Sequence, residues 1–472
     1  MPQDSMDKKA GHFSALDFSA SDSGALELGA GSMIDQSEGV FNRGDGDVNF
    51  RTVGWVQAAM IFLKIIFATG VLSIPSVMVD VGAVPGSIIL LGFTVLNGYS
   101  AIITGNFRKQ HPTCHSIADM AGVVGGAVLQ ELTGALSIIS YIITASSGVI
   151  GVSAAANALP SHAACTLWWY LVATVVIFII SSVRKFSQIG WLSWVGFVSV
   201  FAAVLVVVIG VTQQDRPSAA PATGDFDLEF KIVGHPSFIA GASAAITMFV
   251  SSAATSAFLP VMAEMKQPED YNKAVYLSMS FVTSSYLAFT LVLYYWCGQW
   301  IASPSLGSAG PIIKKIAYGI ALPGLAVSGC LYIHVAAKYL FVRILRNSKH
   351  LQNSSPVHWG TWLSCTCSCS VFAFLLASAI PIFTYVLALV GSICFAPLTI
   401  SLPGLLWVYD NKNSWKDGPC RKAIFTFHIF LVILGVFMTV GGTYSVVSQI
   451  RNAYADGKID AAFSCADNSG TA

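Results

Sequence analysis

Charged residues are scarce in this chain of 472 residues. Asp, Glu, Lys and Arg make up 10% of it, against about 25% in an ordinary soluble domain, which argues against a soluble fold. Hydrophobic residues make up 54%, and apolar runs of about 20 residues, each able to cross a hydrocarbon core of about 30 Å, recur along most of the length. The sequence therefore predicts an all-α polytopic membrane protein in a lipid bilayer.

An excess of charge of either sign is also missing. The chain carries 25 basic and 24 acidic side chains, so it has no global field that would attract nucleic acid. The sequence contains no HExxH, GxSxG or GxxxxGK motif, which argues against a membrane enzyme. We therefore expect no enzymatic activity, no cofactor and no nucleic-acid partner.

A cleavable signal peptide is not apparent. Residues 1–50 are rich in Gly, Ser and Ala with scattered acids, and they hold no apolar segment before a cleavage site. We interpret residues 1–50 as a disordered cytoplasmic tail, residues 51–450 as the membrane domain, and residues 451–472 as a short C-terminal tail on the outer side.

The ten cysteines are dispersed and do not outline a disulfide framework. Cys365, Cys367 and Cys369 form a close triplet, but on a helix only Cys365 and Cys369 share a face. This spacing favours small residues at a helix start over palmitoylation, and palmitoylation over a metal site.

Apolar windows bounded by charges, Pro or Gly predict eleven transmembrane helices. They lie near residues 55–80, 84–107, 127–158, 166–183, 189–211, 235–263, 273–297, 312–346, 358–379, 382–408 and 421–448.

Basic residues indicate the orientation, because Lys and Arg are retained on the cytoplasmic side. With the N-terminus inside, seventeen of the 25 basic residues fall in cytoplasmic segments and six in outer ones, while Lys64 and Lys338 lie inside spans. We therefore predict a cytoplasmic N-terminus and an outer C-terminus. The glycosylation sequon at Asn353 then falls in a cytoplasmic loop and should stay unmodified.

Two spans carry residues that weaken a helix. The first contains IFLKIIFATGVLSIP at residues 61–75, in which Gly70 and Pro75 interrupt the helical ladder. The sixth has a small and hydroxyl run at residues 251–256, followed by Pro260. Spans 1 and 6 begin two successive groups of five, and interrupted helices at corresponding positions indicate two inverted five-helix repeats of a secondary transporter. The alternative is that each is a kinked packing helix.

Interrupted helices expose backbone groups that suit a zwitterion. A half-helix N-terminus suits a carboxylate, and a half-helix C-terminus offers carbonyls to an ammonium. No Asp, Glu or Arg lies beside either break, so we expect neutral amino acids as substrates. The predicted substrate contacts are Ala68, Thr69, Gly70, Val71, Phe249, Ser251 and Ser252, with Phe249 either walling an apolar pocket or simply packing.

Two segments at these breaks resemble a known family. ATGVLSIP at residues 68–75 and FLPVMAEMKQPEDYNKAV at residues 258–275 are similar to the first and sixth helix signatures of the amino acid/auxin permease family. The resemblance covers roughly residues 50–450 and is strongest to the fungal neutral amino acid permeases. It implies two inverted five-helix repeats with an added eleventh helix, and amino acid transport driven by a proton or sodium gradient.

Charges inside a membrane are functional candidates. The resemblance implies proton coupling through Lys64, because sodium-coupled relatives have an Asn at this position and proton-coupled relatives a Lys. His334 and Lys338 share a helix face, and we expect the titratable His334 to approach Lys64. The alternatives are snorkelling lysines and a hydrogen-bonded core histidine. We interpret Glu264 as a cytoplasmic gate or helix-end anchor.

These features predict a secondary active transporter that imports neutral aliphatic and aromatic amino acids by proton symport. A sodium-coupled symporter, an amino acid sensor on a transporter fold and a channel are the alternatives. We expect the plasma membrane rather than the vacuolar membrane as its location.

Overall fold

The computed structural model describes residues 52–114, 116–160, 163–184, 186–221, 223–346, 348, 350–351, 353–380, 382–416, 418–457 and 463–466. The side chains of residues 68–69, 186–189 and 414 are not described. The predicted tail, residues 1–50, lies outside the described residues.

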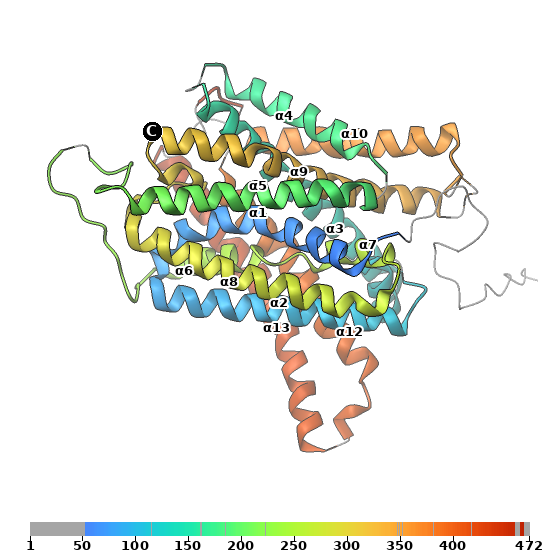
Figure 1. The fold of residues 1–472 in the computed structure, drawn as a ribbon. Coiled ribbons are helices and arrows are strands. Elements are labelled where there is room, and N and C mark those ends of the chain that lie inside the picture. Colours follow the sequence, from blue (N-terminus) through green and yellow to red (C-terminus); the bar gives the residue numbers. More distant parts are fainter. Residues whose placement is uncertain are drawn as a thin grey trace, which may run out of the picture. The chain divides into compact units, whose positions relative to one another are not determined.

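The described chain is built from helices (Figure 1). Four 3-10 turns also occur, at Pro268–Asp270 (η1), Gly298–Trp300 (η2), Ser305–Ser308 (η3) and Ser414–Lys416 (η6). The main helices are α1 (Trp55–Val81), α2 (Ala83–Gln110), α3 (Ile117–Ala158), α4 (Thr166–Ser181), α5 (Phe186–Thr212), α6 (Phe238–Val250), α7 (Thr255–Ala263), α8 (Tyr271–Cys297), α9 (Pro311–Leu345), α10 (Pro356–Ala379), α11 (Phe383–Val390), α12 (Leu402–Asp410) and α13 (Pro419–Ala455).

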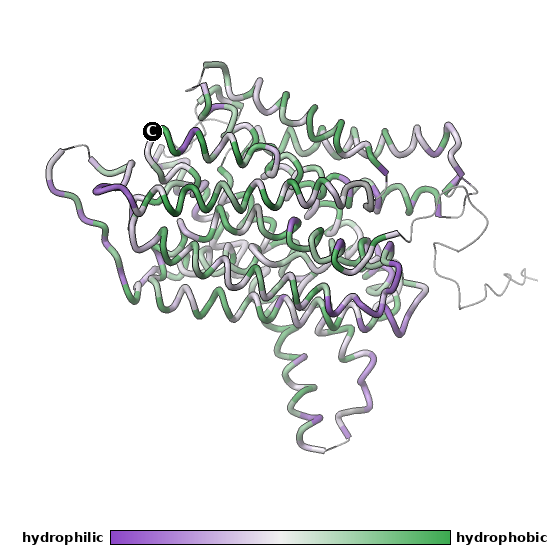
Figure 2. Tube along the Cα trace, viewed as in Figure 1, coloured by the Kyte–Doolittle hydropathy of each residue, from purple (hydrophilic) through white to green (hydrophobic). Residues whose placement is uncertain are grey.

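The helices match the predicted spans closely. Among the described residues, eight helical segments are long and apolar enough to cross a membrane, and two bent pairs raise the number to ten. Figure 2 shows hydrophobic residues along the helices and hydrophilic residues gathered at loops and helix ends. The all-α polytopic fold is confirmed. The count of eleven stays a prediction, because α4 has 16 residues, fewer than the roughly 20 that span a bilayer.

The helices pack in two groups. α3, α4, α9 and α10 contact one another, and α1, α2, α6 and α8 form a second set of contacts. α5 packs against both α1 and α9 and so joins the groups. We call the face at which α1 begins the predicted cytoplasmic face, and the opposite one the predicted outer face.

The third span starts where the sequence predicts, near residue 127, although α3 itself begins earlier. Ser116 caps the first turn of α3. The Ser116 Oγ accepts from the Asp119 N–H at 3.3 Å, and the Asp119 carboxylate accepts from the Ser116 N–H at 3.0 Å. Gly125 and Gly126 then leave helical geometry, with φ of 69° at Gly126, a conformation that glycine adopts without strain. A short capped helix therefore precedes the membrane-spanning part.

The tenth span is also bent, which the sequence analysis did not predict. Its two parts, Phe383–Phe395 and Pro397–Asp410, meet at 41°, and two π-helical turns, η4 (Gly391–Phe395) and η5 (Pro397–Ser401), lie around the bend. A Cβ on Gly391 would lie 2.8 Å from the Cβ of Val250. The missing side chain therefore lets this span approach the end of α6.

A disulfide joins Cys165, just before α4, to Cys465 in the C-terminal tail. The prediction that the cysteines carry no disulfide framework missed this pair, because 300 residues separate the two positions. Beside it, the Thr166 hydroxyl donates to the Ala466 carbonyl at 2.5 Å. Disulfides persist in oxidising compartments, so a bridge at the predicted outer face supports the proposed orientation.

This bridge leads to a labelling prediction. On intact cells, a membrane-impermeant maleimide should label Cys165 and Cys465 only after an impermeant reductant has opened the disulfide. Cys420 provides the control, because it is exposed and lies at the predicted cytoplasmic face. It should react only after the membrane has been permeabilised. Labelling of Cys420 on intact cells would show that the orientation is the reverse of the predicted one.

The cysteine triplet follows the predicted helical spacing. Cys365 and Cys369 are buried on one face of α10, whereas Cys367 is exposed. Trp362 lies one turn before Cys365 and is also buried. The buried pair thus belongs to the packed face of α10.

Candidate functional site: two adjacent broken helices

The sixth span comes apart between α6 and α7. α6 ends at Val250 and α7 begins at Thr255, and the four residues between them are at most 2% exposed. Local bonds replace the helical ladder here, since Ser251 Oγ donates to the Met248 carbonyl at 2.6 Å. The predicted break is confirmed. It falls in the small and hydroxyl run, whereas Pro260 lies within α7.

The first span bends. It stays helical from Trp55 to Val81, but its two parts, Trp55–Phe67 and Gly70–Val81, meet at 41°. The interruption at Gly70 therefore takes the form of a bend. Pro75 lies in the second part and has no N–H to offer the Val71 carbonyl. The Ser305 hydroxyl donates to that carbonyl at 3.4 Å, so a side chain from another segment partners the backbone group that proline leaves without its helical donor.

Tyrosine hydroxyls from two neighbouring helices reach the backbone at these breaks. Tyr332 of α9 donates to the Ile65 carbonyl at 3.2 Å. The Tyr286 hydroxyl of α8 lies 3.0 Å from the Ile66 carbonyl and 3.1 Å from the Ser251 carbonyl. One hydroxyl proton serves one carbonyl at a time. Tyr286 therefore bridges the bend in the first span and the break in the sixth span.

Gly70 lies where the bend in α1 meets the break in span 6. A Cβ at this position would lie 2.0 Å from the Tyr286 hydroxyl oxygen and 2.7 Å from the Ser251 carbonyl oxygen. Both distances are far below van der Waals contact, so only glycine fits without displacing the backbone of the neighbouring break.

Asn97 of α2 is a site residue that the sequence analysis missed. It is completely buried, and its amide Nδ2 donates to the Phe249 carbonyl at 3.0 Å and to Ser252 Oγ at 2.8 Å. It thus supports the C-terminal end of α6. The signal was present, because a polar amide inside a predicted membrane helix is a functional candidate.

The predicted substrate contacts gather at these breaks. Gly70, Val71, Ser251 and Ser252 are all buried, while the side chains of Ala68 and Thr69 lie outside the described part of the structure. The ring of Phe249 packs edge-on against Phe93 of α2, with centroids 5.4 Å apart. Phe249 therefore contributes to packing on its α2 side.

Lys64 places a basic side chain inside the protein. It is completely buried, and its ammonium donates to the Ser328 hydroxyl of α9 at 2.7 Å. On another side, a Cβ on Gly196 of α5 would lie 2.8 Å from Lys64 Cε. Lys64 thus lies where α1, α5 and α9 meet, and it links the two groups of helices.

His334 and Lys338 contact different helices. Lys338 forms a buried ion pair with Glu264 at the end of α7, and the ring of His334 lies against Trp362 of α10 with centroids 5.1 Å apart. Ser328 and His334 are six residues apart, or about 1.7 helical turns, so they leave α9 in different directions. The structure brings Lys64 to Ser328 and places the His334 ring beside α10.

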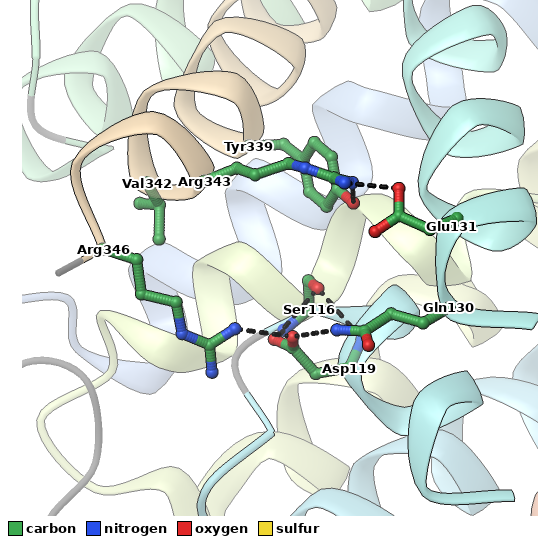
Figure 3. Close-up of a pocket in the computed structure, with 8 residues that line it drawn as sticks. All are labelled: Ser116, Asp119, Gln130, Glu131, Tyr339, Val342, Arg343 and Arg346. Carbon is green, nitrogen blue, oxygen red and sulfur yellow. Dashed lines mark hydrogen bonds and ion pairs between the residues drawn. The ribbon is translucent and has the colours of Figure 1, made fainter. Parts of the chain in front are cut away.

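A polar cavity of about 160 Å³ lies between α3 and α9 near the predicted cytoplasmic face (Figure 3). Arg343 pairs with Glu131, and Arg346 pairs with Asp119 at 2.9 Å. Both helices belong to the same packing group. The Arg343–Glu131 pair is exposed, and exposed pairs contribute about 1 kcal/mol or less, whereas the Asp119 side chain is mostly buried. The cluster therefore ties α3 to α9 and lies apart from the broken spans.

Two solved structures share this arrangement of helices. One is MHP1, a nucleobase-cation-symport-1 family transporter, with a TM-score of 0.53, 12% identity and coverage of 91% of this chain and 99% of that chain. The other is a Na+-coupled sialic acid symporter, with a TM-score of 0.53 and 12% identity. The match covers 84% of this chain and 90% of that chain. At 12% identity, these two similarities concern the fold.

Sequence comparison identifies the family. The family model for transmembrane amino acid transporter proteins matches residues 51–448, and the chain belongs to this family. A "Transmembrane transporter" of Gibberella moniliformis is 46% identical over 92% of each chain. The N amino acid transport system protein of Neurospora crassa is 26% identical over 93% of each chain. The predicted family is thus confirmed. Membership in it supports amino acid transport as the function of this chain.

Proposed function

We propose that this protein imports neutral aliphatic and aromatic amino acids across the plasma membrane by proton symport. The family supplies amino acids as the substrate class. At the break in span 6, α6 ends in carbonyl groups and α7 begins with N–H groups, which suit the ammonium and the carboxylate of a zwitterion. In the sequence, no Asp, Glu or Arg adjoins residues 68–71 or 251–254, which favours substrates with uncharged side chains.

The buried contact between Lys64 and Ser328 carries the proposal of proton coupling. A sodium ion within 4 Å of this ammonium would be repelled by about 4 kcal/mol at an effective dielectric constant of 20. A lysine at the crossing of α1 and α9 therefore disfavours a sodium ion there and holds an exchangeable proton of its own. Movement of α1 relative to α9 would break the 2.7 Å bond to Ser328 and change the environment of that proton.

His334 and the Glu264–Lys338 pair remain secondary coupling candidates. All three side chains are buried, and the pair connects α7 to α9. Their contacts place them on the predicted cytoplasmic side of the breaks. A proton released toward the cytoplasm would pass near these groups.

Replacing Lys64 by Asn tests the coupling directly. In proteoliposomes, we expect Lys64→Asn to abolish acid-driven accumulation of a neutral amino acid while keeping exchange of internal for external substrate within about threefold of wild type, since exchange needs the substrate site alone. Lys315→Asn is the matched control, because Lys315 is exposed and should retain both activities. His334→Ala should weaken accumulation more than exchange.

Three results would overturn these assignments. Acid-stimulated accumulation by Lys64→Asn would remove Lys64 from coupling. A strict sodium requirement in the wild type would favour the sodium-coupled alternative. Saturable binding of amino acids without net flux would identify a sensor.

A further inference from the structure

A second polar cavity lies between the broken spans and the predicted outer face. It has a volume of about 220 Å³, enough for several water molecules of about 30 Å³ each or for one small zwitterion. Its walls come from α1, α6, α11, α13 and the loop before η3. Both broken spans therefore contribute their outer halves to it.

The lining of this cavity is rich in hydrogen-bonding groups and contains one carboxylate. Asp80 supplies the charge near the end of α1. Hydroxyl and amide groups from three other helices surround the same space, namely those of Ser243, Tyr385 and Gln449. A carboxylate accepts from an ammonium, and hydroxyls and amides can donate to a carboxylate. The lining is thus complementary to both ends of a free amino acid.

Asp80 is available to a ligand. Among the described residues, no hydrogen bond or ion pair engages its carboxylate, and the residue is exposed. The nearby ammonium of Lys231 attracts Asp80 electrostatically, but Lys231 itself pairs with Glu229 at 3.2 Å. A solute ammonium can therefore reach Asp80 without displacing an ion pair of its carboxylate.

The cavity lies on the outer side of the breaks, and packed side chains separate it from them. Ser76 in its wall is six residues from Gly70, about 9 Å along a helix. Between cavity and break, Ile246 and Val250 of α6 are buried, and both would contact a Cβ placed on Gly391. Packed apolar residues thus separate this space from the broken helices.

We propose that this outer cavity is an entry site, in which Asp80 binds the ammonium of an amino acid before the zwitterion passes to the broken helices. The site rests on the proposed transport function and extends it to a second, outer position on the same path. Its contribution is to capture the substrate, so it acts on the apparent affinity and not on the maximal rate.

Uptake kinetics of radiolabelled L-leucine test the entry site. Because Asp80 is exposed, the loss of its charge should raise KM by about two- to fivefold, the range of an exposed ion pair, with the maximal rate unchanged in Asp80→Asn. Asp80→Glu retains the carboxylate and should stay within about twofold of wild type. Asp225→Asn removes the same charge from the exposed loop between α5 and α6 and should leave KM unchanged.

The outcomes separate this site from the transport function itself. If the wild type transports L-leucine and Asp80→Asn keeps the wild-type KM, the entry site is wrong and the transport function stands. An equal rise of KM in Asp225→Asn would show that Asp80 acts only through the general surface charge, which contradicts the entry site. A fall in the maximal rate of Asp80→Asn with an unchanged KM would contradict it too, because Asp80 would then act in the conformational cycle. A wild type that transports no neutral amino acid would overturn both proposals.

Discussion

Replacing Gly70 with alanine will lower amino acid uptake about tenfold to a hundredfold. The added Cβ would lie 2.0 Å from the Tyr286 hydroxyl and 2.7 Å from the Ser251 carbonyl. Overpacking of this kind costs about 1–3 kcal/mol, and each 1.4 kcal/mol corresponds to about a factor of ten. The backbone at the break in span 6 must then move, and with it the groups that we propose bind the substrate.

A glycine in α2 provides the matched control. A Cβ on Gly92 would meet nothing within 4 Å, so Gly92→Ala should leave uptake unchanged. Surface expression of both variants is measured first, so that rates refer to equal amounts of protein. Wild-type uptake by Gly70→Ala would show that the close approach of the two breaks is not needed for transport.

Neutralising one member of the Glu264–Lys338 pair will destabilise the protein strongly. Both side chains are buried, with 0% and 4% of their surface exposed, and they pair with each other. Removing one partner of a buried ion pair costs about 3–5 kcal/mol, because a charge then remains without its partner, whereas removing both is often neutral. We expect Glu264→Gln and Lys338→Met to lower the melting temperature in detergent, and the double variant to recover most of it.

The exposed pair Glu229–Lys231 is the control for this cycle. Its ions are 3.2 Å apart and about half exposed, and exposed pairs contribute about 1 kcal/mol or less. Glu229→Gln and Lys231→Met should therefore change the melting temperature little. If Glu264→Gln and Lys338→Met are equally mild, the buried pair is not the anchor of α7 on α9.

The same end of α7 also holds the start of the membrane domain. The Val53 N–H donates to the Glu264 carbonyl at 3.0 Å, and the Lys266 N–H donates to the Val53 carbonyl at 2.8 Å. The chain before α1, the end of α7 and α9 are thus joined at one place on the predicted cytoplasmic face. This arrangement suits the role of helix-end anchor predicted for Glu264.

The broken spans were predictable because their causes are local. Gly70 and Pro75 weaken a helix wherever they stand, and the small residues after Val250 have the same effect on span 6. Their spacing along the chain relates the two positions without any knowledge of tertiary contacts. The bend near Pro397 had the same kind of local signal, since proline weakens that helix as well, and the sequence analysis missed it.

The partners of the freed backbone groups were not predictable. Tyr286, Tyr332 and Asn97 come from three other helices, and nothing in their local sequence indicates which carbonyl each one reaches. The same holds for Lys64, whose burial could be predicted but whose contact with Ser328 depends on how α1 crosses α9. Lys338 and Glu264 were each singled out by their charge, and only the fold shows that they pair.

Competition between an amino acid and its blocked derivatives tests the central claim most directly. Uptake of radiolabelled L-leucine is measured with unlabelled L-leucine, N-acetyl-L-leucine and L-leucine amide as competitors. If the broken backbones bind both charged ends of a zwitterion, only free L-leucine will compete well, and each derivative will be at least about tenfold weaker, as for loss of one charge-assisted hydrogen bond. Equal inhibition by either derivative would contradict this account of the site.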